Sequence, residues 1–192
     1  MLAALQKTVE KVVRPEAVKK AVNQALSTVT DRVPPRVQET LGLWAFGIMK
    51  IPMLAMTTPQ VIELTQEKSV IKIPLNRRTK NHLNGMYFAA LAAGADCAGG
   101  LLTMKLGGKD LGLIFKDFKA NFLKRAEGDV YFTCKNGLEI QGMIARARET
   151  GERQNLPIQV TATVPSKSGD EPVAEFVLTL SLKKVSNSKK SH

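Results

Sequence analysis

One apolar stretch constrains the fold of this chain more than any other feature. It runs from about Asn84 to Leu106, Asp96 is its only acidic residue, and Gly107–Gly108 follow as a helix-ending signal. Its length fits a helix, and a helix that is apolar on all sides has to be buried. The asparagine, the aspartate and several glycines argue against a membrane span. The stretch therefore predicts a central helix buried in a soluble core.

Strand patterns lie on both sides of this predicted helix. A run of alternating residues near the C-terminus places Ala174, Phe176 and Leu178 on one face, with polar residues such as Thr179 and Ser181 on the other. Such alternation predicts an antiparallel sheet with one wet side, and hence an α+β fold. The predicted strands are Val61–Leu64, Ser69–Ile73, Leu113–Leu123, Asp129–Cys134, Ile158–Val164 and Val173–Lys183, with a further helix at Leu138–Thr150.

The chain before residue 58 has a helical pattern instead. Leu2, Leu5 and Val9 begin an amphipathic pattern over residues 1–30, and Arg36–Met56 forms a second, more apolar helical segment. We expect an N-terminal helical extension (1–57), a main domain (58–186) and a basic tail (187–192).

The net charge of +11 points to an anionic partner or to a solvated basic surface. Residues 71–80 contribute Lys72, Arg77, Arg78 and Lys80 without any acid. Aromatic residues make up only 5% and nucleic-acid motifs are missing, so we expect no nucleic acid partner. An anionic membrane surface or a phosphorylated small molecule stays open.

The two cysteines offer neither a disulfide framework nor metal-ligand spacing. Their scarcity fits a reducing compartment, and we expect a cytoplasmic protein. Because the sequence has no glycine-rich phosphate loop and no Cys/His cluster, we expect no cofactor and no metal.

The start of the apolar stretch resembles a known motif. It reads Asn-His-Leu-Asn-Gly-Met-Tyr-Phe-Ala-Ala-Leu-Ala-Ala-Gly-Ala-Asp over Asn81–Asp96. Hotdog thioesterases of the phenylacetyl-CoA thioesterase-like branch have roughly Asn-x-x-Gly-x-x-His-Gly-Gly here, followed seven residues later by an acid. More closely, Val61–Lys184 is similar to the hotdog family DUF4442, as are its segments Pro74–Arg78 and Asn121–Ala126. The resemblance implies a hotdog fold, in which an antiparallel sheet wraps around a central helix.

Several positions depart from the pattern of the active branch. Tyr87 stands in place of its histidine, Phe88 and Ala89 replace its two glycines, and Asn84 replaces the preceding glycine. Phe115 occupies the place of a Ser or Thr that often positions water. The resemblance therefore implies one of two functions: a thioesterase acting on acyl-CoA or acyl-carrier protein, or a non-catalytic acyl-binding or scaffold module.

Asp96 carries the catalytic hypothesis, since an unpaired carboxylate is costly to bury in an apolar helix. It acts as general base or nucleophile toward a thioester carbonyl, or it is half of a buried ion pair, or it caps a backbone group. Its neighbour Cys97 is expected to face elsewhere, because adjacent helical residues differ by about 100°.

The start of the helix supplies the second part of the predicted site. Free N–H groups at Tyr87 and Phe88 could polarise a carbonyl, but Phe88 and Asp96 lie roughly 12 Å apart along one helix. One carbonyl cannot contact both, so we expect a homodimer, or a higher oligomer, in which an antiparallel partner helix completes the site. The small Ala and Gly residues of the helix would suit that packing.

The remaining candidates surround the helix start. Asn81 either holds the substrate or orders the loop, and Tyr87 either donates to the carbonyl or simply packs. Arg77, Arg78 and Lys80 either bind the phosphates of coenzyme A or form an exposed basic patch. A third hypothesis places the lysine-rich N-terminal helix and Leu41–Met56 against a membrane surface.

Overall fold

The computed structural model describes residues 33–108 and 110–185. The predicted helix over 1–30 and the basic tail 187–192 lie outside these residues. Helices and strands are interspersed along the described chain. In order they are α3 (Pro35–Lys50), α4 (Pro52–Met56), β1 (Gln60–Leu64), β2 (Ser69–Ile73), α5 (Phe88–Gly107), β3 (Leu111–Phe122), β4 (Val130–Cys134), α6 (Gly137–Thr150), β5 (Gln154–Thr163), α7 (Pro165–Ser168) and β6 (Pro172–Lys184).

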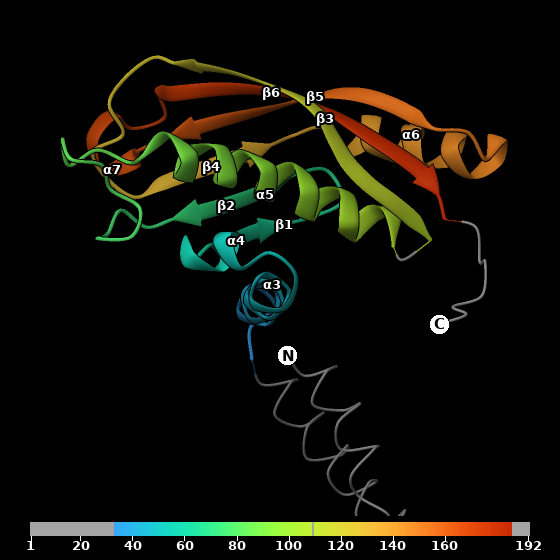
Figure 1. The fold of residues 1–192 in the computed structure, drawn as a ribbon, viewed down its shortest axis with the longest axis horizontal. Helices are drawn as coiled ribbons and strands as arrows, with labels where there is room; N and C mark the ends of the chain where they lie inside the picture. The colour runs from blue at the N-terminus through green and yellow to red at the C-terminus, as the bar shows by residue number, and fades with distance from the viewer. Residues whose placement is uncertain (1–32, 109, 186–192) are drawn as a thin grey trace, which may run out of the picture.

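The six strands form one antiparallel sheet in the order β1-β2-β4-β5-β6-β3. The sheet curves around α5, which lies across its concave side (Figure 1). Side chains from both layers, among them Phe132, Ile158, Phe176, Leu180 and Leu102, are almost completely buried. The predicted α+β architecture, a sheet wrapped around a central helix, is confirmed.

The central helix begins at Phe88, four residues later than the apolar pattern suggested. The residues before it form a tight loop, in which Asn81 Oδ1 accepts hydrogen bonds from the N–H groups of Leu83 (2.9 Å) and Gly85 (3.2 Å). Asn84 has φ +61°, a backbone conformation that glycine adopts freely and that asparagine tolerates better than most L-residues. Asn84, which stands in place of a glycine of the active branch, therefore leaves the loop geometry accessible.

Two glycines of α5 allow the helix to lie close to the sheet. A Cβ on Gly94 would meet the Phe132 ring at 2.3 Å, and one on Gly99 would meet Ile158 Cδ1 at 2.4 Å. The prediction that the glycines serve the packing of a partner helix is therefore wrong for these two. They make room for large side chains of β4 and β5 within the same protomer.

Strand β3 forms one edge of the sheet and contains a bulge. Phe115 pairs with Leu180 and Phe118 with Leu178, so Lys116 and Asp117 together oppose Thr179. The extra residue puts both phenylalanines on the concave side of the sheet, because an uninterrupted strand would point residues 115 and 118 to opposite faces.

The outer face of β6 is less exposed to solvent than predicted, since Ser181 is buried and accepts a hydrogen bond from Arg153 Nη1 at 3.0 Å.

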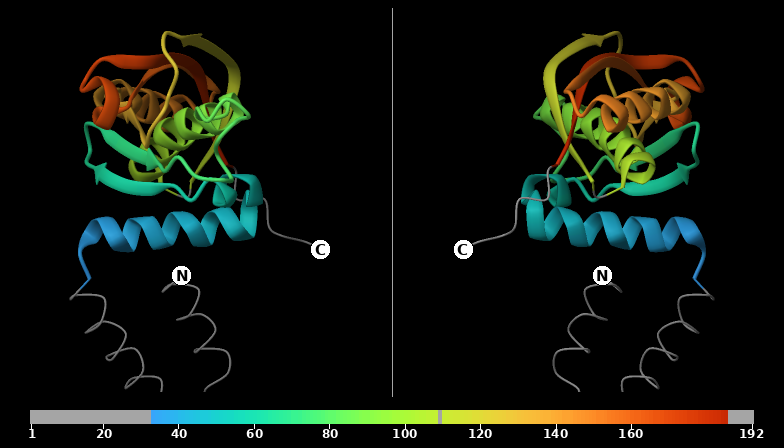
Figure 2. Two further views of the ribbon diagram at one scale, coloured as in Figure 1. Left: turned by 90° about the vertical axis from the view of Figure 1, so that its left-hand side faces the viewer. Right: turned by 90° about the vertical axis from the view of Figure 1, so that its right-hand side faces the viewer.

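The helices α3 and α4 lie beneath the other edge of the sheet (Figures 1 and 2). Pro52 separates them, because proline cannot continue the hydrogen bonding of α3 but suits the first turn of α4. Gly47 packs closely against Ala55, where a Cβ would come within 3.2 Å of the alanine Cβ. The Val61 N–H donates to Thr40 Oγ1 at 2.9 Å and so ties α3 to strand β1. Of the helices in the described part of the chain, none combines the length and apolarity needed to cross a bilayer.

Candidate functional site

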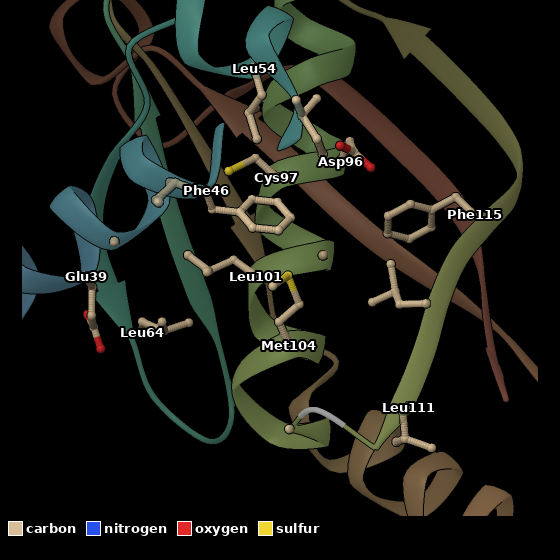
Figure 3. A pocket seen from close by; sticks show the side chains of 16 residues that line it. Glu39, Phe46, Leu54, Leu64, Asp96, Cys97, Leu101, Met104, Leu111 and Phe115 are labelled. Atoms are coloured by element: carbon tan, nitrogen blue, oxygen red, sulfur yellow. The ribbon is translucent and has the colours of Figure 1, made fainter. Parts of the chain in front are cut away.

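A cavity of about 670 Å³ opens beside the middle of α5. Its walls come from α3 and α4 on one side and from the first half of β3 on the other (Figure 3). The lining is apolar apart from Asp96 and Glu39 at separate places in the wall. The main lining side chains are Leu43, Phe46, Leu54, Asp96, Cys97, Leu101, Met104, Leu111, Leu113 and Phe115.

Asp96 is the polar group of α5 that faces this cavity. Its side chain is half-buried, and no group of the described residues forms an ion pair or hydrogen bond with its carboxylate. Burial raises the pKa of the Asp96 carboxyl above its ordinary value, since removal from water disfavours the charged form. The ion-pair and capping interpretations therefore have no partner within residues 33–108 and 110–185.

Cys97 also lines the cavity, so the expectation that it faces elsewhere is wrong (Figure 3). Burial, followed by the repulsive effect of the Asp96 charge, raises the pKa of its thiol to about 12. The thiolate is the nucleophilic form of cysteine, and at such a pKa it is scarcely populated near neutral pH. Cys97 is therefore an inert part of the wall.

The ring of Phe115 closes the cavity from the strand side. A Cβ on Gly100 would lie 3.9 Å from Phe115 Cε2, which shows how near the ring comes to α5. Phenylalanine offers no hydrogen bond, so the position that carries Ser or Thr in the active branch cannot hold a water molecule here. Among the side chains that line the cavity, Asp96 and Glu39 carry the carboxylates that can bind a water molecule.

At the start of α5, two backbone N–H groups have no hydrogen-bond partner in the described part of the chain. The Tyr87 N–H donates to the Thr79 carbonyl at 2.7 Å. The prediction that this N–H group is free is therefore wrong. Phe88 and Ala89 have no acceptor among the described residues. Helix starts leave such donors unpaired, and they suit a carbonyl or oxyanion. The available pair is thus Phe88 and Ala89, one residue later than predicted.

The predicted loop residues gather at the same end of α5. An isolated antiparallel β-bridge joins Lys80 to Met86, and the Tyr87 N–H donates to the Thr79 carbonyl. The basic loop therefore lies against the start of α5. The side-chain oxygen of Asn81 accepts hydrogen bonds within the loop, which favours a role in ordering the loop over direct contact with a substrate. The side chain of Tyr87 is 47% exposed and packs edge-on against Phe88, with ring centroids 4.9 Å apart.

Arg77, Arg78 and Lys80 are exposed, and none forms an ion pair with a described residue. They do not line the Asp96 cavity. Arg78 instead borders a second groove, whose other walls are Trp44, Ile48 and Met56 of α3 and α4. The structure thus brings the basic loop together with Asn81, Tyr87 and Phe88, and leaves Asp96 apart from all of them.

Asp96 and the helix start share one face of α5, although they do not share a cavity. Phe88, Ala92 and Asp96 recur every four residues and are each half-buried or exposed. Side chains at that spacing form a stripe along one side of a helix. Within this stripe Ala92 lies midway between Phe88 and Asp96.

The apolar walls from α3 and α4 are the part of the site that sequence reasoning missed. The signal was present, since Leu43, Phe46 and Leu54 fall within the apolar segment Leu41–Met56. Nothing in the sequence indicated that this segment would face α5 rather than solvent. No cluster of three His, Cys, Asp or Glu side chains suited to a metal ion exists within residues 33–108 and 110–185.

Comparison with protein families matches residues 42–182 to a domain of unknown function, DUF4442. The chain belongs to the DUF4442 family. The matched region begins inside α3, so the family domain includes most of the helical hairpin that walls the cavity. No protein of curated function matches the DUF4442 chain.

Solved structures with the same architecture include proteins described as thioesterases. A Pseudomonas aeruginosa protein of unknown function, described as a probable thioesterase, is 20% identical, with a TM-score of 0.65 and coverage of 80% of this chain and 99% of its own. A thioesterase family protein from Silicibacter pomeroyi is 16% identical, with a TM-score of 0.58 and coverage of 78% and 99%. A thioesterase from Haemophilus influenzae is 14% identical, with a TM-score of 0.55 and coverage of 72% and 86%. The DUF4442 protein shares their hotdog fold.

Proposed function

We propose that the DUF4442 protein binds an acyl thioester, with the acyl chain in the Asp96 cavity, and hydrolyses the thioester. The observation that carries this proposal is Asp96 itself, a half-buried carboxylate without a partner in the described chain, on the wall of an otherwise apolar cavity. A partly buried carboxylate without a partner costs folding free energy, and groups of this kind are concentrated at functional sites. The apolar walls from α3, α5 and β3 suit a hydrocarbon chain.

The chemistry assigned to Asp96 is general-base catalysis. Its carboxylate accepts a proton from a water molecule as the water oxygen attacks the thioester carbonyl. The tetrahedral intermediate then collapses, the C–S bond breaks, and the proton passes to the departing thiolate. The products are a carboxylic acid and a thiol. A raised pKa brings the base closer to neutral pH, where proton acceptance has more driving force.

A homodimer supplies the donors that Asp96 lacks. The unpaired N–H groups of Phe88 and Ala89 lie eight and seven residues before Asp96, so they are roughly 10–12 Å away along the same helix. An antiparallel partner helix that places Phe88 opposite Asp96 has Ala92 at the two-fold axis. A small residue at the crossing point permits close approach of two helices.

The free edge of the sheet supports the same assembly. Strand β3 has twelve residues and pairs only with β6 among the described strands, whereas α3 packs beside the opposite edge at β1. Long unpaired edges are templates for strand addition. Phe118 and Phe122 near this edge are 42% and 50% exposed, although both contact Phe176 of the core. A partner protomer would cover them.

The thioester is proposed to be acyl-CoA or acyl-carrier protein. Both carry phosphate, and Arg77, Arg78 and Lys80 lie beside the helix start where the carbonyl would be held. Guanidinium groups recognise phosphate through paired hydrogen bonds. Their exposure without ion-pair partners in the described chain leaves them available for such a ligand.

A panel of acyl-CoA thioesters, assayed with wild type and Asp96→Asn in parallel, tests the proposal. We expect hydrolysis by wild type and a loss of about 10²–10⁴-fold in the variant, as for other general bases. The rate of wild type should rise with pH as the Asp96 carboxyl ionises. Equal rates for both proteins would contradict the catalytic assignment.

A second candidate, a non-catalytic acyl-binding module, is favoured by one observation. Phe115 faces Asp96 across the cavity and removes the polar side chain that positions water in the active branch. Saturable binding of a non-hydrolysable acyl-CoA analogue, without turnover of any thioester in the panel, would establish this second function and exclude hydrolysis.

A further inference from the structure

The hairpin of α3 and α4 has a second apolar side that faces away from the cavity. We define the α3–α4 surface by the exposed large apolar side chains that do not line the cavity: Trp44, Ile48, Met49, Met53 and Met56. Ile48, Met49, Met53 and Met56 are more than 60% exposed. Scattered apolar residues are normal on a surface, but a cluster of this kind marks an interaction site.

The two sides of α3 explain why so many apolar residues are exposed. Leu43 and Phe46 face the cavity, and Gly47 packs on Ala55 of α4. Trp44 and Ile48, four residues apart, share the opposite side. Because the inner side is held by the cavity wall and by the close helix contact, the outer residues cannot turn inward to become buried.

Two cations lie beside this apolar cluster, and helices α3 and α4 contribute no acid to it. Lys50 is exposed at the end of α3, and Arg78 borders the groove formed with Trp44, Ile48 and Met56. The single acid of residues 33–58, Glu39, faces the cavity and pairs with Lys105 at 3.1 Å. An apolar cluster with a cationic rim is complementary to a surface that is apolar inside and anionic outside.

We propose that the α3–α4 surface docks on an anionic lipid bilayer, with the apolar side chains in the interfacial region and the cations against lipid phosphates. Amphipathic helices with basic rims bind membranes in this way, lying on the bilayer without crossing it. Trp44 fits this position, because its ring is partly exposed while its Nε1 is satisfied by the Pro59 carbonyl at 2.6 Å.

Charge argues against two other occupants within reach. Residues 1–32 are themselves basic, with six Lys or Arg and three Asp or Glu, so they do not complement the cations of the α3–α4 surface. A second copy of the chain would oppose like charges there, and the proposed dimer uses β3, at the other edge of the sheet. An anionic bilayer complements both the α3–α4 surface and residues 1–32.

Flotation of the 192-residue chain with lipid vesicles tests this proposal without any thioester, so its outcome is independent of the proposed hydrolysis. We expect binding to vesicles of phosphatidylcholine with phosphatidylglycerol, and little binding to phosphatidylcholine alone. Binding should weaken as salt is raised, since ions screen exposed charges. Equal binding to both vesicle types, or no binding to either, would overturn the proposal.

Two double variants locate the bound surface. Ile48→Asp/Met53→Asp should reduce the vesicle partition coefficient at least about tenfold, because it replaces inserted apolar groups by charges. Without coenzyme A, the other ligand proposed for Arg78, Lys50→Glu/Arg78→Glu should reduce the partition coefficient by roughly fivefold or more for each cation. The matched controls are Leu138→Asp, at a residue that is 70% exposed on α6, and Lys135→Glu/Arg146→Glu, both exposed and near or on α6. Both controls should bind as wild type does.

A further variant separates the α3–α4 surface from the N-terminal segment. If Lys19→Glu/Lys20→Glu abolishes binding while Ile48→Asp/Met53→Asp binds like wild type, residues 1–32 are the membrane contact and the proposal fails. Circular dichroism and melting curves show whether each variant is folded. Substitutions at exposed positions should leave both unchanged, so loss of binding by a folded α3–α4 variant is the supporting result.

Discussion

Gly94 of α5 lies directly against the ring of Phe132 in β4. A Cβ at residue 94 would come within 2.3 Å of Phe132 Cε2, a distance that carbon atoms do not tolerate. The central helix can therefore sit in the concave sheet only because this position has no side chain. Since α5 also carries Asp96, the contact between Gly94 and Phe132 helps to set how far the Asp96 carboxylate lies from the sheet.

The first prediction concerns this contact. Gly94→Ala should lower the free energy of unfolding by about 1–3 kcal/mol, because the added methyl group forces Phe132 or the helix to move. Gly100→Ala is the matched control, since its Cβ would meet Phe115 at an ordinary 3.9 Å and alanine favours helix. Urea unfolding curves measure both. A Gly94→Ala protein as stable as wild type would show that the core yields easily here.

The second prediction concerns the stability of Asp96→Asn as a function of pH. The pKa of Asp96 is raised by burial, so its charge destabilises the native state at neutral pH. Asparagine removes that cost, and the variant should unfold at the same or a higher temperature at pH 7. The stability difference between the variant and wild type should shrink as pH falls from the raised pKa of Asp96 in the folded protein toward the ordinary value of about 3.9.

The opposite outcome would identify a different role for Asp96. If the carboxylate is half of a buried ion pair with a group beyond the described residues, Asp96→Asn leaves a cation unpaired. Stability would then fall by about 3–5 kcal/mol. Thermal melts from pH 4 to pH 8, set beside the hydrolysis assays, distinguish a catalytic carboxylate from a structural one.

The third prediction concerns the dimer. Ala92→Arg should convert a dimer into a 21.0 kDa monomer, because a long charged side chain at the helix crossing prevents close approach. Hydrolysis should be lost with it, since Asp96 then has no partner N–H groups opposite. Ala145→Arg, on the exposed side of α6, is the control and should stay dimeric. Light scattering that finds wild type monomeric at micromolar concentration would contradict the proposed assembly.

The fourth prediction concerns the basic loop. Arg77→Ala/Arg78→Ala should weaken coenzyme A binding about tenfold or more and flatten its salt dependence, because two charge-assisted phosphate contacts are removed. Calorimetry with coenzyme A measures the effect. Acyl-pantetheine, which lacks the nucleotide phosphates, should bind both proteins alike. If the affinity for coenzyme A were unchanged, these arginines would not bind its phosphates and would be part of a solvated basic patch.

Local patterns in the sequence were sufficient for most of the fold. The alternation in Val173–Lys183 predicted β6 within one residue at each end, and the predicted strands Val61–Leu64 and Ser69–Ile73 match β1 and β2 equally closely. The buried helix followed from its apolar composition alone. Such features depend on period and turn chemistry, which neighbouring residues determine. The start of α5 was placed too early because apolar residues continue through the loop that Asn81 organises.

The arrangement of the site depended on contacts between segments far apart in the chain. Whether Asp96 has a partner, and whether Cys97 faces the same cavity, follows from how α3, α4 and β3 surround α5. The bulge that turns Phe115 and Phe118 to one side is a pairing of β3 with β6, invisible in either strand alone. The sequence by itself determined which residues could do chemistry and which segments had to be buried. Only the tertiary structure decided which of them share a cavity, because burial and proximity arise when distant surfaces pack together.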